Sequence, residues 1–405
     1  MSLDPSLLEQ GFARHFALDP GVDYLNHGSF GACPRAVLDA QHALRERLER
    51  GPTRFLGREL EGMIDSARHA LAQLIDAPAE QLAFVPNATT GVNIVLGSLE
   101  LSPGDELLMT DHTYNACKNA LAHFAESAGA RAVVAQVPFP LSSEDEVVRA
   151  LEAAVTERTK LLLIDHVTSP TGLVLPVARI IAAMHARGVR VLVDGAHAPG
   201  MLALSLRTLG ADYYTGNCHK WLCTPKGSAF LYVAEQYLGE TRPLVISHGA
   251  SAWRFRKDRP RFWLEHDWVG TVDPTPFLCI PSAIDALSSL LPGGLPALQA
   301  RNRALALTAR KLLCDALGID APAPESMIAS LASVPLPDAH EPAVTFYDGL
   351  QTRLYDEHRI EAIVSYFPSY PRRVLRVCAQ AYNTLPQYER LARVLQSELA
   401  HARES

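Results

Sequence analysis

An acidic and a basic side chain follow two apolar runs of this sequence, and each is costly to bury alone. Asp194 closes the run Val189–Asp194, and Lys220 comes shortly after a second short run. A buried carboxylate needs a cationic partner. Because His219 and Trp221 flank Lys220, we expect this lysine to be partly desolvated. Desolvation lowers the pKa of a lysine and makes its amine a nucleophile that can form a Schiff base.

The pair of Asp194 and Lys220 has two explanations, which the pair by itself does not separate. In the first, the lysine binds the aldehyde of pyridoxal 5′-phosphate (PLP) and the carboxylate keeps the pyridine nitrogen protonated. The ring then accepts the electrons that are released at Cα of an amino acid. In the second, the two side chains form a buried salt bridge that has only a structural role.

Alternating apolar runs and amphipathic segments must position these residues. Strands that alternate with helices predict an α/β fold with a mostly parallel sheet covered by helices on both faces. Ligands of such sheets bind at the carboxyl ends of the strands. The predicted strands are Leu82–Val85, Glu106–Thr110, Arg131–Gln136, Leu161–Asp165, Val189–Asp194, Asp212–Thr215 and Ala229–Val233, and the predicted helices between them include Gly91–Ser98, Ala116–Ser127, Glu144–Thr156 and Pro176–Arg187.

The length of 405 residues predicts a large domain and a smaller one, because single cores rarely grow so large. We predict a large domain over residues 36–282 and a small α+β C-terminal domain over residues 283–405. Residues 1–35 are expected to pack with the small domain. The predicted strands of the small domain are Ala343–Tyr347, Ile360–Val364 and Val374–Val377.

Composition argues against several classes of protein. The formal net charge is −7 and no dense Lys/Arg run occurs, so neither nucleic acid nor a membrane surface is an expected partner. Seven irregularly spaced cysteines do not make a disulfide framework, which favours reduced thiols and a cytoplasmic location. We find no signal peptide after Met1 and no apolar run of the roughly 18 residues that a membrane span needs.

Seven blocks, in order along nearly the whole chain, resemble the class V aminotransferase group of fold-type I PLP enzymes. Within that group the chain is most similar to isopenicillin N epimerase-like proteins. Each block is weak alone, and their common order is what makes the resemblance specific. The blocks are Tyr24–Gly31, Pro86–Gly91, Asp111–Ala116, Asp165–Gly172, Asp194–His197, Asn217–Trp221 and Arg376–Asn383.

The resemblance implies roles around the ring of the cofactor. Lys220 is implied as the Schiff-base lysine and Asp194 as the partner of the pyridine nitrogen. His197 is implied near the phenolic oxygen. Tyr114 is expected to stack on the ring face, with His112 as the second choice. Packing in the core is the alternative for Tyr114, and a structural hydrogen bond is the alternative for His197.

The resemblance also implies a phosphate site. Ala88 and Thr89 are expected to bind the phosphate at the start of a helix, where backbone N–H groups favour anions, although the threonine could simply cap that helix. Asn217 and His219 are expected to add contacts. The segment with Thr271 resembles the one that reaches the phosphate of a neighbouring subunit, which implies a homodimer with the active site at its interface.

For the amino-acid substrate, the resemblance implies that Arg376 binds the α-carboxylate, a task suited to the guanidinium fork, unless it forms a surface ion pair. Asn26 and His27 are further candidates for contact with the substrate. Ser169 stands where several relatives have asparagine beside the cofactor, which weakens a simple transaminase interpretation. No metal is expected. Cys218, His219 and Cys223 could be metal ligands, but no fourth ligand is evident.

Epimerisation or racemisation at Cα is the function that the resemblance favours. It needs Lys220 as base and a second acid, for which His27, His112 and Tyr114 are candidates. A PLP-dependent β-lyase (a cysteine desulfhydrase or C–S lyase) and an aminotransferase are the alternatives. A non-catalytic PLP-binding module is disfavoured because no basic helix-turn-helix segment is present. The pocket for the substrate side chain is expected to be built by Trp253, the Arg261–Trp268 stretch and the partner subunit.

Overall fold

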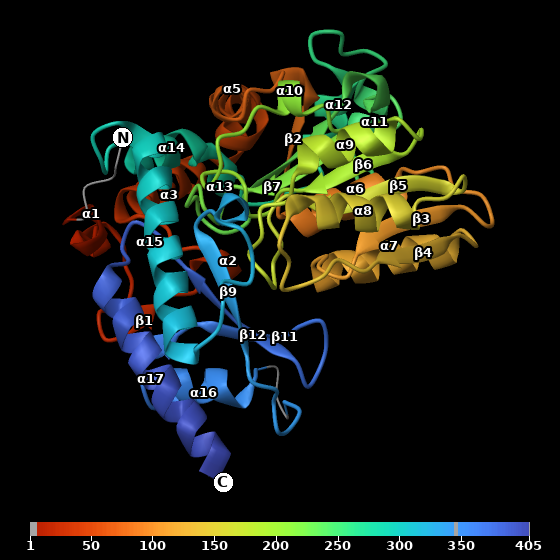
Figure 1. Ribbon diagram of the computed structural model, residues 1–405. Helices are drawn as coiled ribbons and strands as arrows, with labels where there is room; N and C mark the ends of the chain where they lie inside the picture. Colours follow the sequence, from red (N-terminus) through yellow and green to blue (C-terminus); the bar gives the residue numbers. More distant parts are fainter. Residues whose placement is uncertain (1–5, 344–346, 405) are drawn as a thin grey trace.

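A seven-stranded sheet forms the centre of the larger part of the protein (Figure 1). The computed structural model describes residues 6–343 and 347–404. The strand order is β2-β8-β7-β6-β5-β3-β4, and only β8 runs antiparallel to its neighbours. The predicted α/β fold with a mostly parallel sheet is therefore confirmed. The strands are β2 Leu82–Val85, β3 Glu106–Thr110, β4 Arg131–Ala135, β5 Thr159–Asp165, β6 Arg190–Asp194, β7 Tyr213–Asn217 and β8 Ala229–Val233.

Helices cover both faces of this sheet, which is why the inner strands read as continuous apolar runs rather than alternating ones. Every residue of β3, β7 and β8 is buried. Helix α6 packs beside α7, and α8 packs beside α9. The helices of this part are α3 Arg35–Arg50, α4 Pro52–Arg54, α5 Leu60–Leu74, α6 Ala88–Gly97, α7 Asn115–Ser127, α8 Glu144–Ala154, α9 Val177–His185, α10 Leu206–Leu209, α11 Gly249–Ala252, α12 Arg261–His266 and α13 Thr275–Leu278.

The C-terminal part is built on a three-stranded antiparallel sheet, β11-β12-β9, which packs against the long helix α15 (Figure 1). Its strands are β9 Leu331–Leu336, β10 Ile360–Glu361, β11 Ile363–Tyr366 and β12 Arg373–Cys378, and its helices are α15 Gly294–Leu317, α16 Gly349–Asp356 and α17 Leu385–Glu404. Strand β9 was not predicted from the sequence. The predicted strand Ala343–Tyr347 falls largely on residues 344–346, which lie outside the described residues.

The N-terminal segment lies against this C-terminal part. Strand β1 (Asp23–Tyr24) pairs with β10 in parallel, between the short helices α1 (Ser6–Glu9) and α2 (His27–Phe30). The buried guanidinium of Arg301 in α15 donates to the backbone oxygens of Gln10 and Asn383. The segments that contain Gln10 and Asn383 are thereby joined to one helix. The N-terminal segment is held close to the carboxyl ends of the large sheet, where Ser29 and Phe30 line a cavity.

A helix spans the position at which we expected the two parts to join. The predicted boundary at residue 282 falls inside helix α14 (Ile280–Ser288), which packs against both α3 and α5 as well as α15. A helix that shares its core with α3 and α5 belongs with the larger part. We therefore propose that the boundary lies between α14 and α15.

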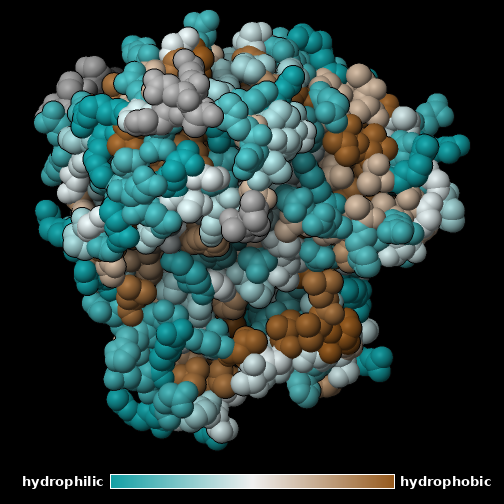
Figure 2. Space-filling view, turned by 90° about the horizontal axis from the view of Figure 1, so that it is seen from below, coloured by the Kyte–Doolittle hydropathy of each residue, from teal (hydrophilic) through white to brown (hydrophobic). Residues whose placement is uncertain are grey.

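The face seen from below carries separate apolar patches on a mainly hydrophilic background (Figure 2). Among the described residues, no helix combines the length and the apolar character that crossing a bilayer requires. All seven cysteines are buried as free thiols, as expected from their irregular spacing.

Candidate active site

A cavity of about 510 Å³ lies at the carboxyl ends of the sheet strands. Parallel strands point their carboxyl ends to one edge, so polar residues from distant positions meet there. Residues from the N-terminal segment complete the wall. The lining residues are Ser29, Phe30, Asn87, Ala88, Thr89, Thr90, Tyr114, Asp165, Val167, Ser169, Asp194, Ala196, His197, Asn217, His219 and Lys220. Nine residues predicted as catalytic or cofactor-binding are among them.

Lys220 is the nucleophilic amine of this cavity. Burial lowers its pKa to about 8, and the positive charge of Arg376 acts in the same direction. The carboxylate of Asp194 opposes both effects. A substantial fraction of the Lys220 amine is therefore neutral near pH 8, which is the form that attacks an aldehyde.

The ring of His197 is held in one tautomer by Trp221. The indole Nε1–H of Trp221 donates to Nδ1 of His197 over 3.2 Å. Since an indole can only donate, Nδ1 must be the acceptor, and burial lowers the pKa of His197 well below its usual value. The neutral ring therefore carries its proton on Nε2, which lies 3.4 Å from Nζ of Lys220.

Asp194 supplies the carboxylate of the cavity at the end of β6. Its side chain is 3% exposed. Oδ1 accepts from the backbone N–H of Ala196 at 3.0 Å, and Oδ2 accepts from the thiol of Cys117 at 3.3 Å. Burial raises the pKa of Asp194, whereas these donors and the charge of Lys220 favour its ionised form. A cationic ring nitrogen would complete the charge balance of this carboxylate.

The other end of the cavity is built to bind an anion. Helix α6 begins there, and Asn87 caps it by accepting the backbone N–H of Thr90 at 2.8 Å. Thr89 lines the cavity in the first turn. Oδ1 of Asn217 accepts the N–H of Ala88 at 2.8 Å, which leaves the amide NH₂ as its donor. Unpaired N–H groups and the dipole of a helix start favour a phosphate at this position.

His219 lies beside this helix start. Its Nδ1 contacts the backbone oxygen of Ser228 at 2.7 Å, and burial lowers its pKa to about 4. A phosphate dianion in the cavity would oppose that shift, because an adjacent negative charge favours the protonated ring.

Arg376 is a buried cation that has no carboxylate partner among the described residues. It donates to the backbone oxygen of Ser169 at 2.6 Å, to Oγ of Ser29 at 3.1 Å and to Oδ1 of Asn26 at 3.2 Å. A fourth acceptor, Oγ of Ser169, lies at 3.4 Å. All four acceptors are neutral, and Nε is buried without a hydrogen-bond partner. An uncompensated guanidinium beside the cavity is the feature expected of a site for a carboxylate.

Two predicted histidines do not line the cavity. Nε2 of His27 donates to the backbone oxygen of Lys220 at 3.0 Å, and its Nδ1 contacts the hydroxyl of Tyr382 at 2.8 Å. Nε2 of His112 contacts the oxygen of Val137, and its Nδ1 contacts the hydroxyl of Thr171. Both rings have both nitrogens engaged within the protein. The substrate contact that we expected of His27 and the stacking role considered for His112 do not fit these positions.

The other predicted residues are placed as follows. Tyr114 lies at the start of α7, lines the cavity and is 46% exposed. Asn26 contacts Arg376 rather than lining the cavity itself. Thr271 is exposed and does not line the cavity of its own chain.

Sequence reasoning missed two residues that act on Asp194. Cys117 projects from α7 onto its carboxylate, and nothing in the sequence pattern marks this contact. Asp165 ends β5 beside it, and its signal was visible, since it closes an apolar run as Asp194 does.

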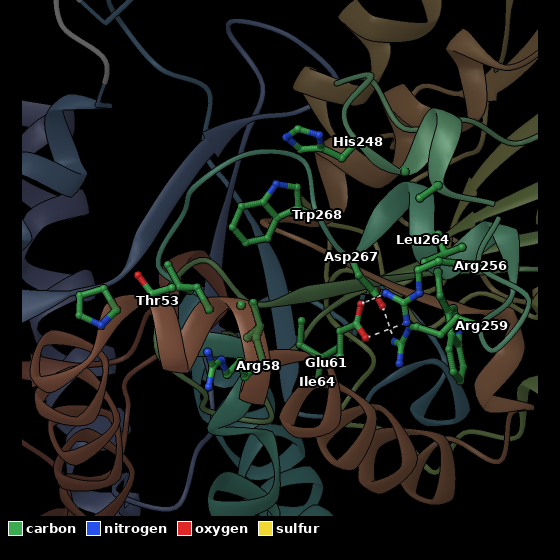
Figure 3. Close-up of a pocket in the computed structure, with 17 residues that line it drawn as sticks. Thr53, Arg58, Glu61, Ile64, His248, Arg256, Arg259, Leu264, Asp267 and Trp268 are labelled. Carbon is green, nitrogen blue, oxygen red and sulfur yellow. Dashed lines mark hydrogen bonds and ion pairs between the residues drawn. The ribbon is translucent and has the colours of Figure 1, made fainter. Parts of the chain in front are cut away.

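The stretch that we expected to hold the substrate side chain lines a different cavity. That cavity, of about 530 Å³, shares no lining residue with the one around Lys220. Figure 3 shows Asp267 and Trp268 at its wall, with Arg259 bonded to Asp267 and Arg256 bonded to Glu61. Ion pairs of Asp267 with Arg68 and of Arg259 with Asp65 hold this segment against α5. No residue of the stretch lines the cavity around Lys220 of the same chain, and a pocket that it forms together with the partner subunit stays a prediction.

The residues present fit PLP. A helix start with amide donors suits the phosphate, the carboxylate of Asp194 suits a pyridinium, and Lys220 suits the aldehyde. The chain matches the aminotransferase class-V family over residues 32–347 and belongs to that family. It is a PLP-dependent enzyme.

Several relatives cover nearly the whole chain. It is 38% identical to the isopenicillin N epimerase of Amycolatopsis lactamdurans, over 94% of this chain and 96% of that protein. It is 36% identical to the isopenicillin N epimerase of Streptomyces clavuligerus, over 93% and 95%. It is also 30% identical to a probable chloroplastic L-cysteine desulfhydrase of Arabidopsis thaliana, over 96% and 85%.

Among solved structures, the cystine C–S lyase C-DES in complex with cysteine persulfide matches with a TM-score of 0.76 and 25% identity. The match covers 93% of this chain and 98% of that one. The fold is thus shared with a C–S lyase. Of the relatives above, the two with 38% and 36% identity carry the name of an epimerase and the one with 30% identity carries the name of a desulfhydrase.

Proposed function

We propose that this enzyme moves the proton at Cα of an amino acid and inverts the configuration there, as an epimerase or racemase. The observation that carries the proposal is the identity of 38% and 36% to two isopenicillin N epimerases, each along nearly the full length of both chains. A β-lyase is the second candidate, because desulfhydrases are similar over comparable lengths at 30% identity. An aminotransferase is a third.

Three residues of the chain have separate roles in the proposed reaction. Bound PLP supplies the electron sink that makes the proton at Cα acidic. Arg376 binds the α-carboxylate and so fixes which bond at Cα faces the base. The Lys220 amine, with its pKa near 8, takes the proton from one face. Nε2 of His197 lies 3.4 Å from Nζ of Lys220, and we propose that its N–H donates to the phenolic oxygen of the cofactor and so orients the cofactor ring.

Inversion needs an acid on the opposite face, and we propose Tyr114 for this role. Its side chain lines the cavity and is half exposed, whereas His27 and His112 use both ring nitrogens elsewhere. Burial raises the pKa of Tyr114, so its hydroxyl stays protonated and can donate at neutral pH. None of the seven cysteines lines this cavity, which argues against a persulfide relay.

The test is NMR of amino acids with the holoenzyme in heavy water, using a panel that includes both enantiomers of cysteine and cystine. Incorporation of deuterium at Cα with inversion, and without keto acid, supports an epimerase. Pyruvate and ammonia together with a sulfur product would show that the enzyme is a β-lyase and not an epimerase. Formation of a keto acid with loss of the amino group from the substrate would show that the enzyme is an aminotransferase and not an epimerase.

Two variants test the assigned acids and bases. Lys220→Ala should abolish exchange and inversion, and borohydride should link the cofactor to the Lys220 peptide of the wild type only. Tyr114→Phe should keep exchange of the original enantiomer but lose inversion by about 100-fold, the lower range of general acid catalysis. Inversion at the wild-type rate in Tyr114→Phe would exclude Tyr114 as the second acid.

We also propose that the protein is a cytoplasmic homodimer in which Thr271 contacts the phosphate site of the partner. The exposed Thr271 and the 55% exposed side chain of Val272 support the proposal. Light scattering should give twice the mass of the chain, and Thr271→Ala should weaken PLP binding. A monomer that binds PLP with full affinity would exclude both the homodimer and the contact of Thr271 with the phosphate site of the partner.

A further inference from the structure

Two carboxyl groups end neighbouring strands of the sheet. Asp165 closes β5 and Asp194 closes β6, and the two residues are direct partners in the parallel register. Neighbouring strands are about 4.8 Å apart and register partners point to the same side. The side chains are 2% and 3% exposed, and both residues line the cavity of Lys220. Two acids are thus held side by side, out of water.

The two acids have different partners. Asp194 faces the cation of Lys220 and receives the N–H of Ala196 and the thiol of Cys117. Asp165 receives the hydroxyl of Thr113 and the backbone N–H of Tyr114. Its Oδ2 is buried with no hydrogen-bond partner, and it forms no ion pair with another described residue.

The charged and titratable groups around Asp165 come from three elements. They are Asp194 on β6, Cys117 and Lys118 on α7, and Tyr114 in the loop before that helix. The ammonium of Lys118 donates to the backbone oxygen of Asp111 at 2.6 Å, and among the described residues it forms no ion pair with Asp165. Burial raises the pKa of Asp165, and the like charge of Asp194, the strongest of these groups, acts in the same direction. Adjacent buried carboxyl groups do not readily ionise together.

We propose that Asp165 is a positioning residue of the cofactor site: a neutral carboxylic acid whose free oxygen carries the proton and donates a hydrogen bond to the carboxylate of Asp194. A donor to the ionised form favours that form. Asp165 therefore keeps Asp194 ionised despite burial, so that Asp194 is ready to pair with the pyridine nitrogen of PLP. The proposal rests on that pairing, and it holds whichever reaction the enzyme catalyses.

Substitutions separate this proposal from its alternatives. Asp165→Asn keeps a neutral side chain that can both donate and accept, whereas Asp165→Leu keeps the approximate shape but can do neither. If Asp165 acted as a second negative charge, asparagine would be as harmful as leucine. If it only anchored the loop before α7 through Thr113, then Thr113→Val would reproduce the effect of leucine.

The experiment measures the dissociation constant of PLP from each purified variant, and that of 1-deazapyridoxal phosphate, which has carbon in place of the pyridine nitrogen. We expect Asp165→Asn and Thr113→Val to bind PLP within about twofold of wild type. Asp165→Leu should bind PLP about tenfold more weakly, the scale of one hydrogen bond to a charged group. Binding of the deaza analogue should change by less than about twofold in every variant.

Three results would overturn the proposal. One is a loss of PLP affinity in Asp165→Asn equal to that in Asp165→Leu. Another is an equal loss for PLP and the deaza analogue, which would indicate a structural role. The third is an Asp194→Asn variant that binds PLP as well as wild type, which would remove the pairing that Asp165 is proposed to support. None of these results depends on whether the enzyme inverts, eliminates or transaminates.

Discussion

Replacing Arg376 with methionine separates substrate binding from stability. The side chain donates to four neutral acceptor atoms, two of them on Ser169, and leaves Nε without a hydrogen-bond partner in a buried place. Methionine loses these bonds, each worth about 1.5–3 kcal/mol because the donor is charged. It also removes an uncompensated buried charge, whose desolvation costs several kcal/mol. Because the two contributions oppose each other, we expect the stability of the unliganded protein to change little.

The loss should appear when a carboxylate binds. Removing one member of a buried, hydrogen-bonded charge pair costs about 2–5 kcal/mol, which corresponds to at least about 30-fold in affinity. Titration of the holoenzyme with glycine and with glycinamide, followed by the absorbance of the cofactor, isolates this contribution. Wild type should prefer glycine, and Arg376→Met should lose that preference.

A second buried arginine supplies the control. Arg301 also lies in the C-terminal part and donates to the backbone oxygens of Gln10, Gln380 and Asn383, where it joins segments of the fold. Arg301→Met should lower the melting temperature but keep the preference for glycine over glycinamide. If Arg376→Met kept that preference while melting early, Arg376 would be structural and the assigned carboxylate site would be wrong.

Three further predictions concern the lysine and the rings beside it. Trp221→Phe removes the donor to Nδ1 of His197, so ¹⁵N NMR should show a mixture of tautomers in place of one, at a cost of about 1–3 kcal/mol in stability; an unchanged spectrum would contradict the assignment. The rate at which apoenzyme captures PLP should rise through pH 8 and then level off, because the neutral Lys220 amine reacts and its pKa is lowered to about 8; a rise that continues towards pH 10 would contradict it. His27→Phe removes the bond to the backbone of Lys220 and should lower the melting temperature and slow that capture, whereas capture at the wild-type rate would show that His27 does not position Lys220.

Local signals in the sequence determined the large sheet and much of its site. Strands β2, β3 and β8 have the bounds predicted from the sequence, because strands covered on both faces are mostly apolar between their ends. The residues that follow those ends, such as Asp194 and Lys220, were visible for the same reason. Where runs were short or interrupted the prediction was less complete, as for β9, which contains Pro335 and was not recognised.

Contacts between distant segments decided the rest. His27 and Arg376 both lie in sequence blocks that resemble the family. In the folded chain, His27 hydrogen-bonds the backbone oxygen of Lys220, whereas Arg376 lies beside the cavity with its Nε unpaired. Asp165 and Asp194 each end an apolar run of the sequence. The register between β5 and β6 makes them neighbours, and their hydrogen-bond partners differ. Residue type sets what a group can donate or accept, whereas its pKa and its partners depend on burial and on side chains far away in the sequence. The pKa and the hydrogen-bond partners of a side chain are therefore decided by the tertiary structure and not by the local sequence.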